Sequence, residues 1–156
     1  MMKRTLILTL MAFALLGCKE KEWVDWQAMN QEWLRQNATK DSIVTTPTGL
    51  QYKVIRQGIA GSVKPDINKT VVVDYTGSLI TGNVFDSGSE YPMAMSSVVK
   101  GFAEGLSKMN KSGHYILYIP AELAYGREGH GNEGDDRYIP PFSTLIFDVT
   151  LLDTYY

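Results

Sequence analysis

The sequence has one cysteine and two histidines among its 156 residues, so it offers few groups for nucleophilic or metal chemistry. It contains no G-x-S-x-G, H-E-x-x-H or C-x-x-C motif and no phosphate-binding glycine loop. The net charge is -2, so the chain has no excess of basic residues with which to bind the phosphates of nucleic acids. These absences exclude the common hydrolase and metalloenzyme sites, and they predict a protein with no metal, no cofactor and no nucleic-acid partner.

The two histidines give weak signals. His114 lies in a strand-like alternating pattern and is interpreted as a structural or exposed residue rather than as a base. His130 lies in the loop GREGHGNEGDDRY, where Glu133, Asp135 and Asp136 suggest a calcium site as one alternative. Their spacing differs from that of an EF-hand, so we interpret this segment as a solvated loop.

The N-terminus has the layout of a secretory signal. Lys3 and Arg4 precede an apolar run, Leu6–Leu16, and the small Gly17. The run is shorter than the about 20 apolar residues that a spanning helix needs. The sequence LLGC at positions 15–18 resembles a bacterial lipobox, which implies that residues 1–17 are removed and that Cys18 is lipidated. The alternative is an ordinary cleaved signal with an incidental cysteine.

Lipidation of Cys18 predicts a chain anchored to a membrane but not crossing it. Lys19 follows the cysteine where resemblance to enterobacterial lipoproteins associates Asp with retention at the inner membrane. We therefore expect a cell-envelope protein, at the outer membrane if the cell has two, with its domain in the periplasm or at the cell surface. The oligomeric state is left open by the sequence.

Residues 18–46 are predicted to form a helical segment and a linker. Trp26, Met29 and Trp33 follow the i, i+3, i+7 spacing of one helical face. The interpretation is a spacer that docks on the domain, and the alternatives are a dimerisation helix or a partner-binding surface. TTPTG at positions 45–49 is typical of a linker, and the domain is assigned to residues 47–156.

From Gly49 onward the apolar residues alternate with polar ones, as in β-strands. Strands are predicted near residues 50–54, 71–76, 113–119 and 144–152, with a hairpin turn at Thr81–Asn83. The one convincing domain helix is Val98–Met109, although Gly101 and Gly105 lower its intrinsic propensity. Strands surrounding a single helix predict an α+β fold, an antiparallel sheet wrapped around that helix.

Four segments resemble consecutive signature blocks of the FKBP-type peptidyl-prolyl cis/trans isomerases: VDYTGSLITGNVFDSG, VVKGFAEGLSKM, YIPAELAYGREGHG and YIPPFSTLIFDVTLLD. They occur in the family's order and cover roughly residues 49–153. The resemblance implies the FKBP-like fold, a twisted antiparallel sheet around a short helix, which agrees with the fold predicted from periodicity.

The resemblance also implies an apolar pocket. Its catalytic residues would be Asp86, Tyr125 and Phe102, and its substrate-binding residues would be Tyr75, Phe85, Tyr91, Val98, Val99, Tyr138, Ile139 and Phe147. Phe102 stands where the family usually has a tryptophan at the pocket floor. The loop after His130 is several residues longer than in minimal members. In F-D-S-G, a turn-capping role is the alternative for Asp86.

The implied activity is cis/trans isomerisation of X-Pro bonds in exported proteins, without a cofactor. The partners would be proline-containing polypeptides, with macrolides as further ligands. One alternative is a non-catalytic proline-peptide-binding or chaperone module. Another is a structural envelope lipoprotein whose aromatic N-terminal helix recruits a partner.

Overall fold

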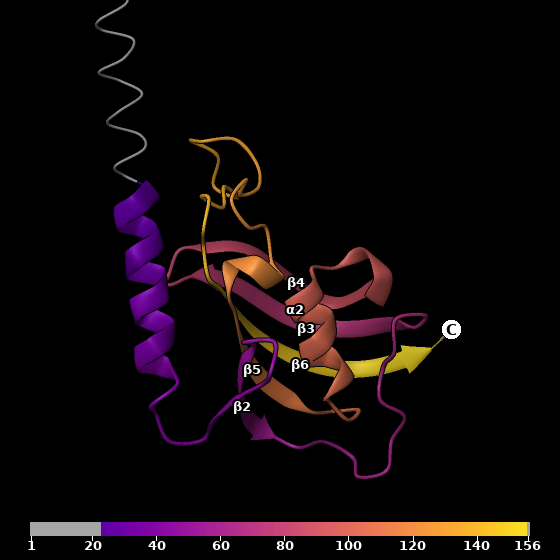
Figure 1. Cartoon of the computed structure of the whole chain (residues 1–156). Coiled ribbons are helices and arrows are strands. Elements are labelled where there is room, and N and C mark those ends of the chain that lie inside the picture. Colours follow the sequence, from indigo (N-terminus) through magenta and orange to yellow (C-terminus); the bar gives the residue numbers. More distant parts are fainter. Residues whose placement is uncertain (1–22, 156) are drawn as a thin grey trace, which may run out of the picture.

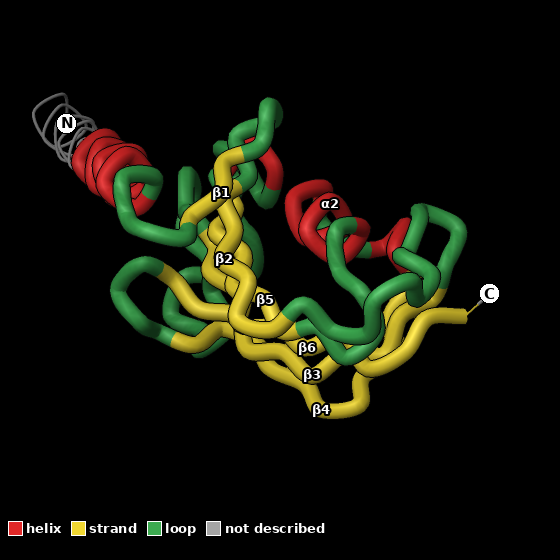
Figure 2. The backbone as a smooth tube through the Cα atoms, turned by 90° about the horizontal axis from the view of Figure 1, so that it is seen from below, coloured by secondary structure: helices red, strands yellow, loops and turns green. Residues whose placement is uncertain are grey.

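The computed structural model describes residues 23–155, which form a six-stranded antiparallel sheet, one domain helix and an N-terminal helix. In chain order the strands are β1 (Ile43–Thr45), β2 (Gln51–Arg56), β3 (Thr70–Leu79), β4 (Val84–Ala94), β5 (His114–Ile119) and β6 (Leu145–Tyr155). Their order across the sheet is β1-β2-β5-β6-β3-β4 (Figure 1). The sheet curls around helix α2 (Lys100–Ser107), as Figure 2 shows from below. The predicted α+β fold is confirmed.

One face of the sheet forms the core, because successive side chains of a strand point to opposite faces. The buried inward positions are Val71, Val73 and Leu79 on β3, Tyr115, Leu117 and Ile119 on β5, and Leu145, Phe147, Val149 and Leu151 on β6. This confirms the predicted alternation. β3 and β6 extend further than predicted, since they pair with each other from Thr70–Tyr155 to Leu79–Leu145.

Helix α2 is shorter than the predicted Val98–Met109, and the prediction was wrong at both ends. Val98 and Val99 have extended backbone angles and precede the helix. At the other end, the backbone N–H of Lys108 donates to the carbonyl of Gly105 and that of Met109 donates to the carbonyl of Leu106, which closes the last turn. Met109 lies beyond the helix and is fully buried. Tertiary packing, rather than a continuing helix, therefore places these apolar side chains.

The two glycines of α2 allow the helix to lie directly on β5. A Cβ atom at Gly101 would collide with the side chain of Ile119, and one at Gly105 would collide with the side chain of Leu117. Glycine lowers helix propensity by up to about 1 kcal/mol relative to alanine. Close contact between helix and sheet explains why this sequence has glycine at both positions.

The N-terminal helix, residues 23–37, docks on the domain through polar and aromatic contacts. The indole Nε1 of Trp26 donates to Ser143 Oγ at 3.1 Å, and Asn30 Oδ1 accepts from the backbone N–H of Thr144 at 2.8 Å. The ring of Trp33 lies 5.6 Å from that of Tyr118. The prediction was wrong about Met29, which is 56% exposed, because Asn30 occupies the docking face instead.

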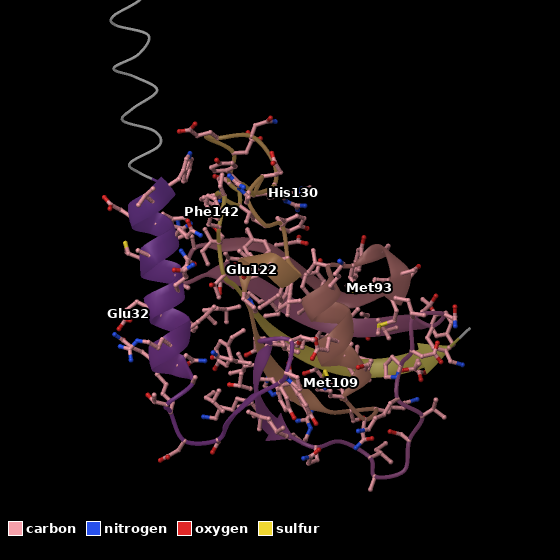
Figure 3. The ribbon with its side chains drawn as sticks, in the orientation of Figure 1. Glu32, Met93, Met109, Glu122, His130 and Phe142 are labelled. Atoms are coloured by element: carbon pink, nitrogen blue, oxygen red, sulfur yellow. The ribbon has the colours of Figure 1, made fainter. Side chains whose placement is uncertain are left out.

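Figure 3 shows the two sides of this helix. Phe142 lies between the helix and the domain, whereas Glu32 points away and pairs with Arg35 on the exposed face. Within residues 23–155, no helix combines the length and apolar composition that crossing a membrane requires. Residues 1–22, which include the predicted signal peptide and Cys18, lie outside the described residues.

Candidate functional site

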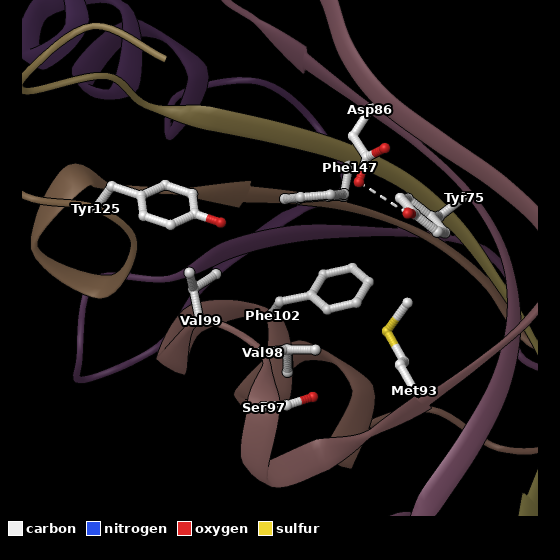
Figure 4. Close-up of a pocket in the computed structure, with 9 residues that line it drawn as sticks. All are labelled: Tyr75, Asp86, Met93, Ser97, Val98, Val99, Phe102, Tyr125 and Phe147. Atoms are coloured by element: carbon white, nitrogen blue, oxygen red, sulfur yellow. Dashed lines mark hydrogen bonds between the residues drawn. The ribbon is translucent and has the colours of Figure 1, made fainter. Parts of the chain in front are cut away.

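A cleft of about 290 Å³ opens between α2 and the concave face of the sheet (Figure 4). Strands β3, β4 and β6, the segment before α2, α2 itself and the turn at Tyr125 all contribute to it. The lining residues are Tyr75, Asp86, Met93, Ser97, Val98, Val99, Phe102, Tyr125 and Phe147. Seven of these nine residues were proposed from the sequence. The fold brings them together from positions up to 72 residues apart, from Tyr75 to Phe147.

Aromatic rings form the floor of the cleft. Phe102 is only 3% exposed, and its ring centroid lies 4.5 Å from that of Phe147 and 6.4 Å from that of Tyr75. Phe147 is in turn supported from behind by Phe85, whose ring lies 5.6 Å away nearly perpendicular to it. Such edge-to-face packing is favourable for aromatic rings, so the floor is apolar and held on several sides.

Two phenol groups and one carboxylate face this apolar floor. The hydroxyl of Tyr75 donates to Asp86 Oδ2 at 2.8 Å. Burial, together with this hydrogen bond, raises the pKa of Tyr75 to about 12. Burial also raises the pKa of Tyr125, and the charge of Asp86 adds to the effect. Both phenols are therefore protonated hydrogen-bond donors at neutral pH, and the hydroxyl of Tyr125 points into the cleft in Figure 4.

The other proposed site residues surround the cleft without lining it. Phe85 and Tyr138 line a separate cavity, and the Phe85 ring packs against that of Phe147. Tyr91 is 51% exposed and packs edge-on against Tyr75. Ile139 is 2% exposed and belongs to the core. These side chains therefore support or flank the cleft.

Three residues near the cleft were missed from the sequence. Met93 lies on β4 two positions before the buried Met95, and side chains two positions apart on an extended chain point to the same face. Ser97 directly precedes the Val98–Val99 pair, which was proposed. Arg137 lies 3.7 Å from Asp86 Oδ1 through its Nη1 atom, and no local pattern links these two distant positions.

The histidines take structural positions. His130 stacks on Tyr125 with ring centroids 4.6 Å apart, and its backbone pairs with that of Ile139. His114 contacts Asp148 across β5 and β6 at 2.6 Å. Among residues 23–155 no group of three or more His, Cys, Asp or Glu side chains is arranged to hold a metal ion. Glu133, Asp135 and Asp136 thus form no such cluster.

The chain thus combines an antiparallel sheet curled around one helix with an aromatic-floored cleft, and the cleft is rimmed by two phenols and a carboxylate. The sequence profile described as FKBP-type peptidyl-prolyl cis-trans isomerase matches residues 61–152. A second profile, the domain amino terminal to that isomerase, matches residues 14–54. The chain belongs to the FKBP-type peptidyl-prolyl cis-trans isomerase family.

Several relatives and structures agree with this assignment. The chain is 39% identical to the isomerase FkpA of Escherichia coli over 138 residues, which cover 86% of this chain and 48% of FkpA. It is 42% identical to the 22 kDa FKBP-type isomerase of the same species, over 82% of this chain and 62% of that protein. The crystal structure of E. coli FkpA superposes with a TM-score of 0.80 at 36% identity, covering 97% of this chain and 72% of that one.

A relative from Legionella longbeachae is named outer membrane protein MIP and is 38% identical over 81% of this chain and 53% of its own length. The chain thus spans about half the length of FkpA and MIP.

Proposed function

We propose that this chain is a peptidyl-prolyl cis/trans isomerase that assists the folding of exported proteins. The observation that carries the proposal is the cleft of about 290 Å³ with its floor of Phe102 and Phe147. A proline ring is small and apolar, and a concave apolar site with a few polar groups suits such a ligand.

The chemistry requires no nucleophile. Rotation about an X-Pro bond has a barrier of about 20 kcal/mol, because amide resonance is lost in the twisted state. A site that binds the twisted imide more tightly than the planar forms lowers this barrier, about 1.36 kcal/mol for each tenfold in rate. The twisted imide has less charge separation than the planar one, so transfer from water into an apolar cleft costs it less.

Each group of the cleft has a role in this proposal. Phe102 lies under the proline ring, and Tyr75, Val98 and Phe147 form the walls. The Tyr125 hydroxyl and the Val99 backbone N–H hold substrate carbonyls on either side of the rotating bond. The Asp86 carboxylate orients Tyr75 through their hydrogen bond and faces the twisting imide. Phe85, Tyr91, Tyr138 and Ile139 support the walls and rim.

The test is the isomerisation rate of a short X-Pro peptide with the full chain. We expect acceleration that falls at least about tenfold in Phe102→Ala, because the floor is lost, and is retained in Phe102→Trp, which keeps an aromatic floor. Asp86→Asn preserves the shape of the carboxylate and should also lower turnover. Circular dichroism of each variant shows whether it is folded. A folded wild-type chain without acceleration would overturn the proposal.

The second candidate is a proline-peptide-binding module with little turnover. The features that favour it are the phenylalanine at position 102, where the family usually has a tryptophan, and a rim loop after His130 that is longer than in minimal members. In that case titration calorimetry would detect peptide binding that Phe102→Ala abolishes, while the isomerisation rate stays at the uncatalysed value. A macrolide that competes with the peptide would place both ligands in the same cleft.

The proposed location is the cell envelope, with the chain anchored through lipid on Cys18. The layout of residues 1–18 supports this, and a relative bears the name outer membrane protein. In a bacterial host, incorporation of labelled palmitate that is lost in Cys18→Ser would support lipidation. Incorporation unchanged in Cys18→Ser, or absent from the wild type, would contradict it.

A further inference from the structure

We propose that Arg137 is a positioning residue that holds the Asp86 carboxylate in its working orientation. The inference rests on the proposed isomerase function and deepens it. It assigns a role to the loop between Tyr125 and Ile139, which follows the cleft wall at one end and enters the core at the other.

The two oxygens of Asp86 have different partners. Oδ2 accepts the hydrogen bond from the Tyr75 hydroxyl at 2.8 Å, and Oδ1 lies 3.7 Å from Nη1 of Arg137. The Tyr75 partner comes from β3 and the Arg137 partner from the loop, so the carboxylate is held from two sides. A carboxylate with a partner on each oxygen loses rotational freedom about its last torsion before a substrate arrives.

The loop that carries Arg137 is anchored at its base. The backbone of His130 exchanges two hydrogen bonds of 2.8 Å with that of Ile139, and the His130 ring stacks on Tyr125. Ile139, two residues after Arg137, is 2% exposed. The loop therefore touches the Tyr125 wall of the cleft through His130 and the Asp86 wall through Arg137, and its closed base limits where the guanidinium can go.

Charge and exposure indicate when the pair acts. Arg137 is the only Lys or Arg between residues 128 and 138. Its side chain is 81% exposed and that of Asp86 is 38% exposed, so salt and water weaken the pair in the free protein. A bound client polypeptide covers the mouth of the cleft and removes water, which strengthens the interaction between the two charges.

The experiment compares kcat/KM for a short X-Pro peptide in the full chain and five variants. Arg137→Ala removes the charge, and Arg137→Lys keeps it. The matched control is Arg127→Ala, which removes an exposed arginine from the same loop. Arg127 lines a different cavity from the one that holds Asp86. Arg137→Ala combined with Asp86→Asn, measured against Asp86→Asn alone, tests whether Arg137 acts through the carboxylate. Each rate is measured at low salt and at about 1 M salt, where the Debye length is about 3 Å.

We expect Arg137→Ala to lower kcat/KM about two- to fivefold at low salt, the range of an exposed ion pair. Arg137→Lys should recover most of the loss, Arg127→Ala should match the wild type, and the deficit should shrink at high salt. In the Asp86→Asn background, Arg137→Ala should have no further effect. Wild-type activity in Arg137→Ala, or an equal loss in the Asp86→Asn background, would overturn the inference alone. An inactive wild type would overturn the proposed function and this inference with it.

Discussion

Replacing Asn30 by alanine tests whether the N-terminal helix belongs to the same folding unit as the sheet. Asn30 is 2% exposed and its Oδ1 is the acceptor for the buried backbone N–H of Thr144. Loss of that acceptor leaves a buried donor unsatisfied, which costs about 1–3 kcal/mol. The higher helix propensity of alanine returns up to about 0.7 kcal/mol. The expected loss in the free energy of unfolding is therefore about 1–2 kcal/mol.

Urea unfolding followed by two signals provides the assay. All three tryptophans, Trp23, Trp26 and Trp33, lie in the N-terminal helix, so tryptophan fluorescence reports its docking. Far-UV circular dichroism reports the whole secondary structure. If the helix and the sheet unfold together, the two transitions coincide in the wild type, and both midpoints move to lower urea in Asn30→Ala.

The matched control is Gln31→Ala, an exposed position next to Asn30 on the same helix, where the substitution also raises helix propensity, by a smaller amount. It should leave the free energy of unfolding within about 0.5 kcal/mol of the wild type. The reasoning is refuted if Asn30→Ala matches this control. It is also refuted if the fluorescence transition precedes the dichroism transition in the wild type, because the helix would then be an independently detaching appendage.

Three further predictions concern packing and pH. Gly105→Ala should destabilise the domain by about 1–3 kcal/mol in urea unfolding despite its better helix propensity, because the new methyl group collides with Leu117; a gain in stability would contradict the packing. Met29→Lys should change the free energy of unfolding by less than about 0.5 kcal/mol, whereas Trp33→Ala, which loses contact with the domain, should lower it clearly. The pKa of Tyr75 is raised from 10.0 to about 12, so its stabilising contribution is fully present below pH 10 and is lost as the pH rises through 12. Thermal unfolding between these pH values should show a smaller decline in Tyr75→Phe than in the wild type.

Periodicity predicted the sheet well because its strands bury one face. Val71, Val73 and Tyr75 alternate with polar or less buried residues and mark the inward face of β3. This pattern can be recognised without knowing which strands pair with β3. Periodicity failed at α2, where Val98, Val99 and Met109 follow the apolar spacing of a helix but are placed by tertiary packing.

Two contacts are harder to predict from the sequence: the one that docks the N-terminal helix and the one between Arg137 and Asp86. Asn30 is a polar residue on a docking face, and its partner is a backbone N–H 114 residues away. Arg137 contacts Asp86 across 51 residues. Neither contact leaves a local periodic signal, and a charge in a polar loop is usually solvated. By contrast, Met93 could have been found, because Tyr91, Met93 and Met95 recur at every second position, the spacing of one face of an extended chain.

The segment from Arg137 to Thr144 connects the N-terminal helix to the mouth of the cleft. At one end Arg137 reaches Asp86, and at the other Ser143 accepts from the Trp26 indole and donates to the carbonyl of Pro140 at 2.7 Å. Only two residues separate Arg137 from Pro140, so the contact with the helix and the contact with Asp86 lie on one short stretch of backbone. This makes the helix part of the rim's support. It also explains why an isomerase assay should retain residues 23–37, because removing them deletes the partners of Ser143 and Thr144 beside the site.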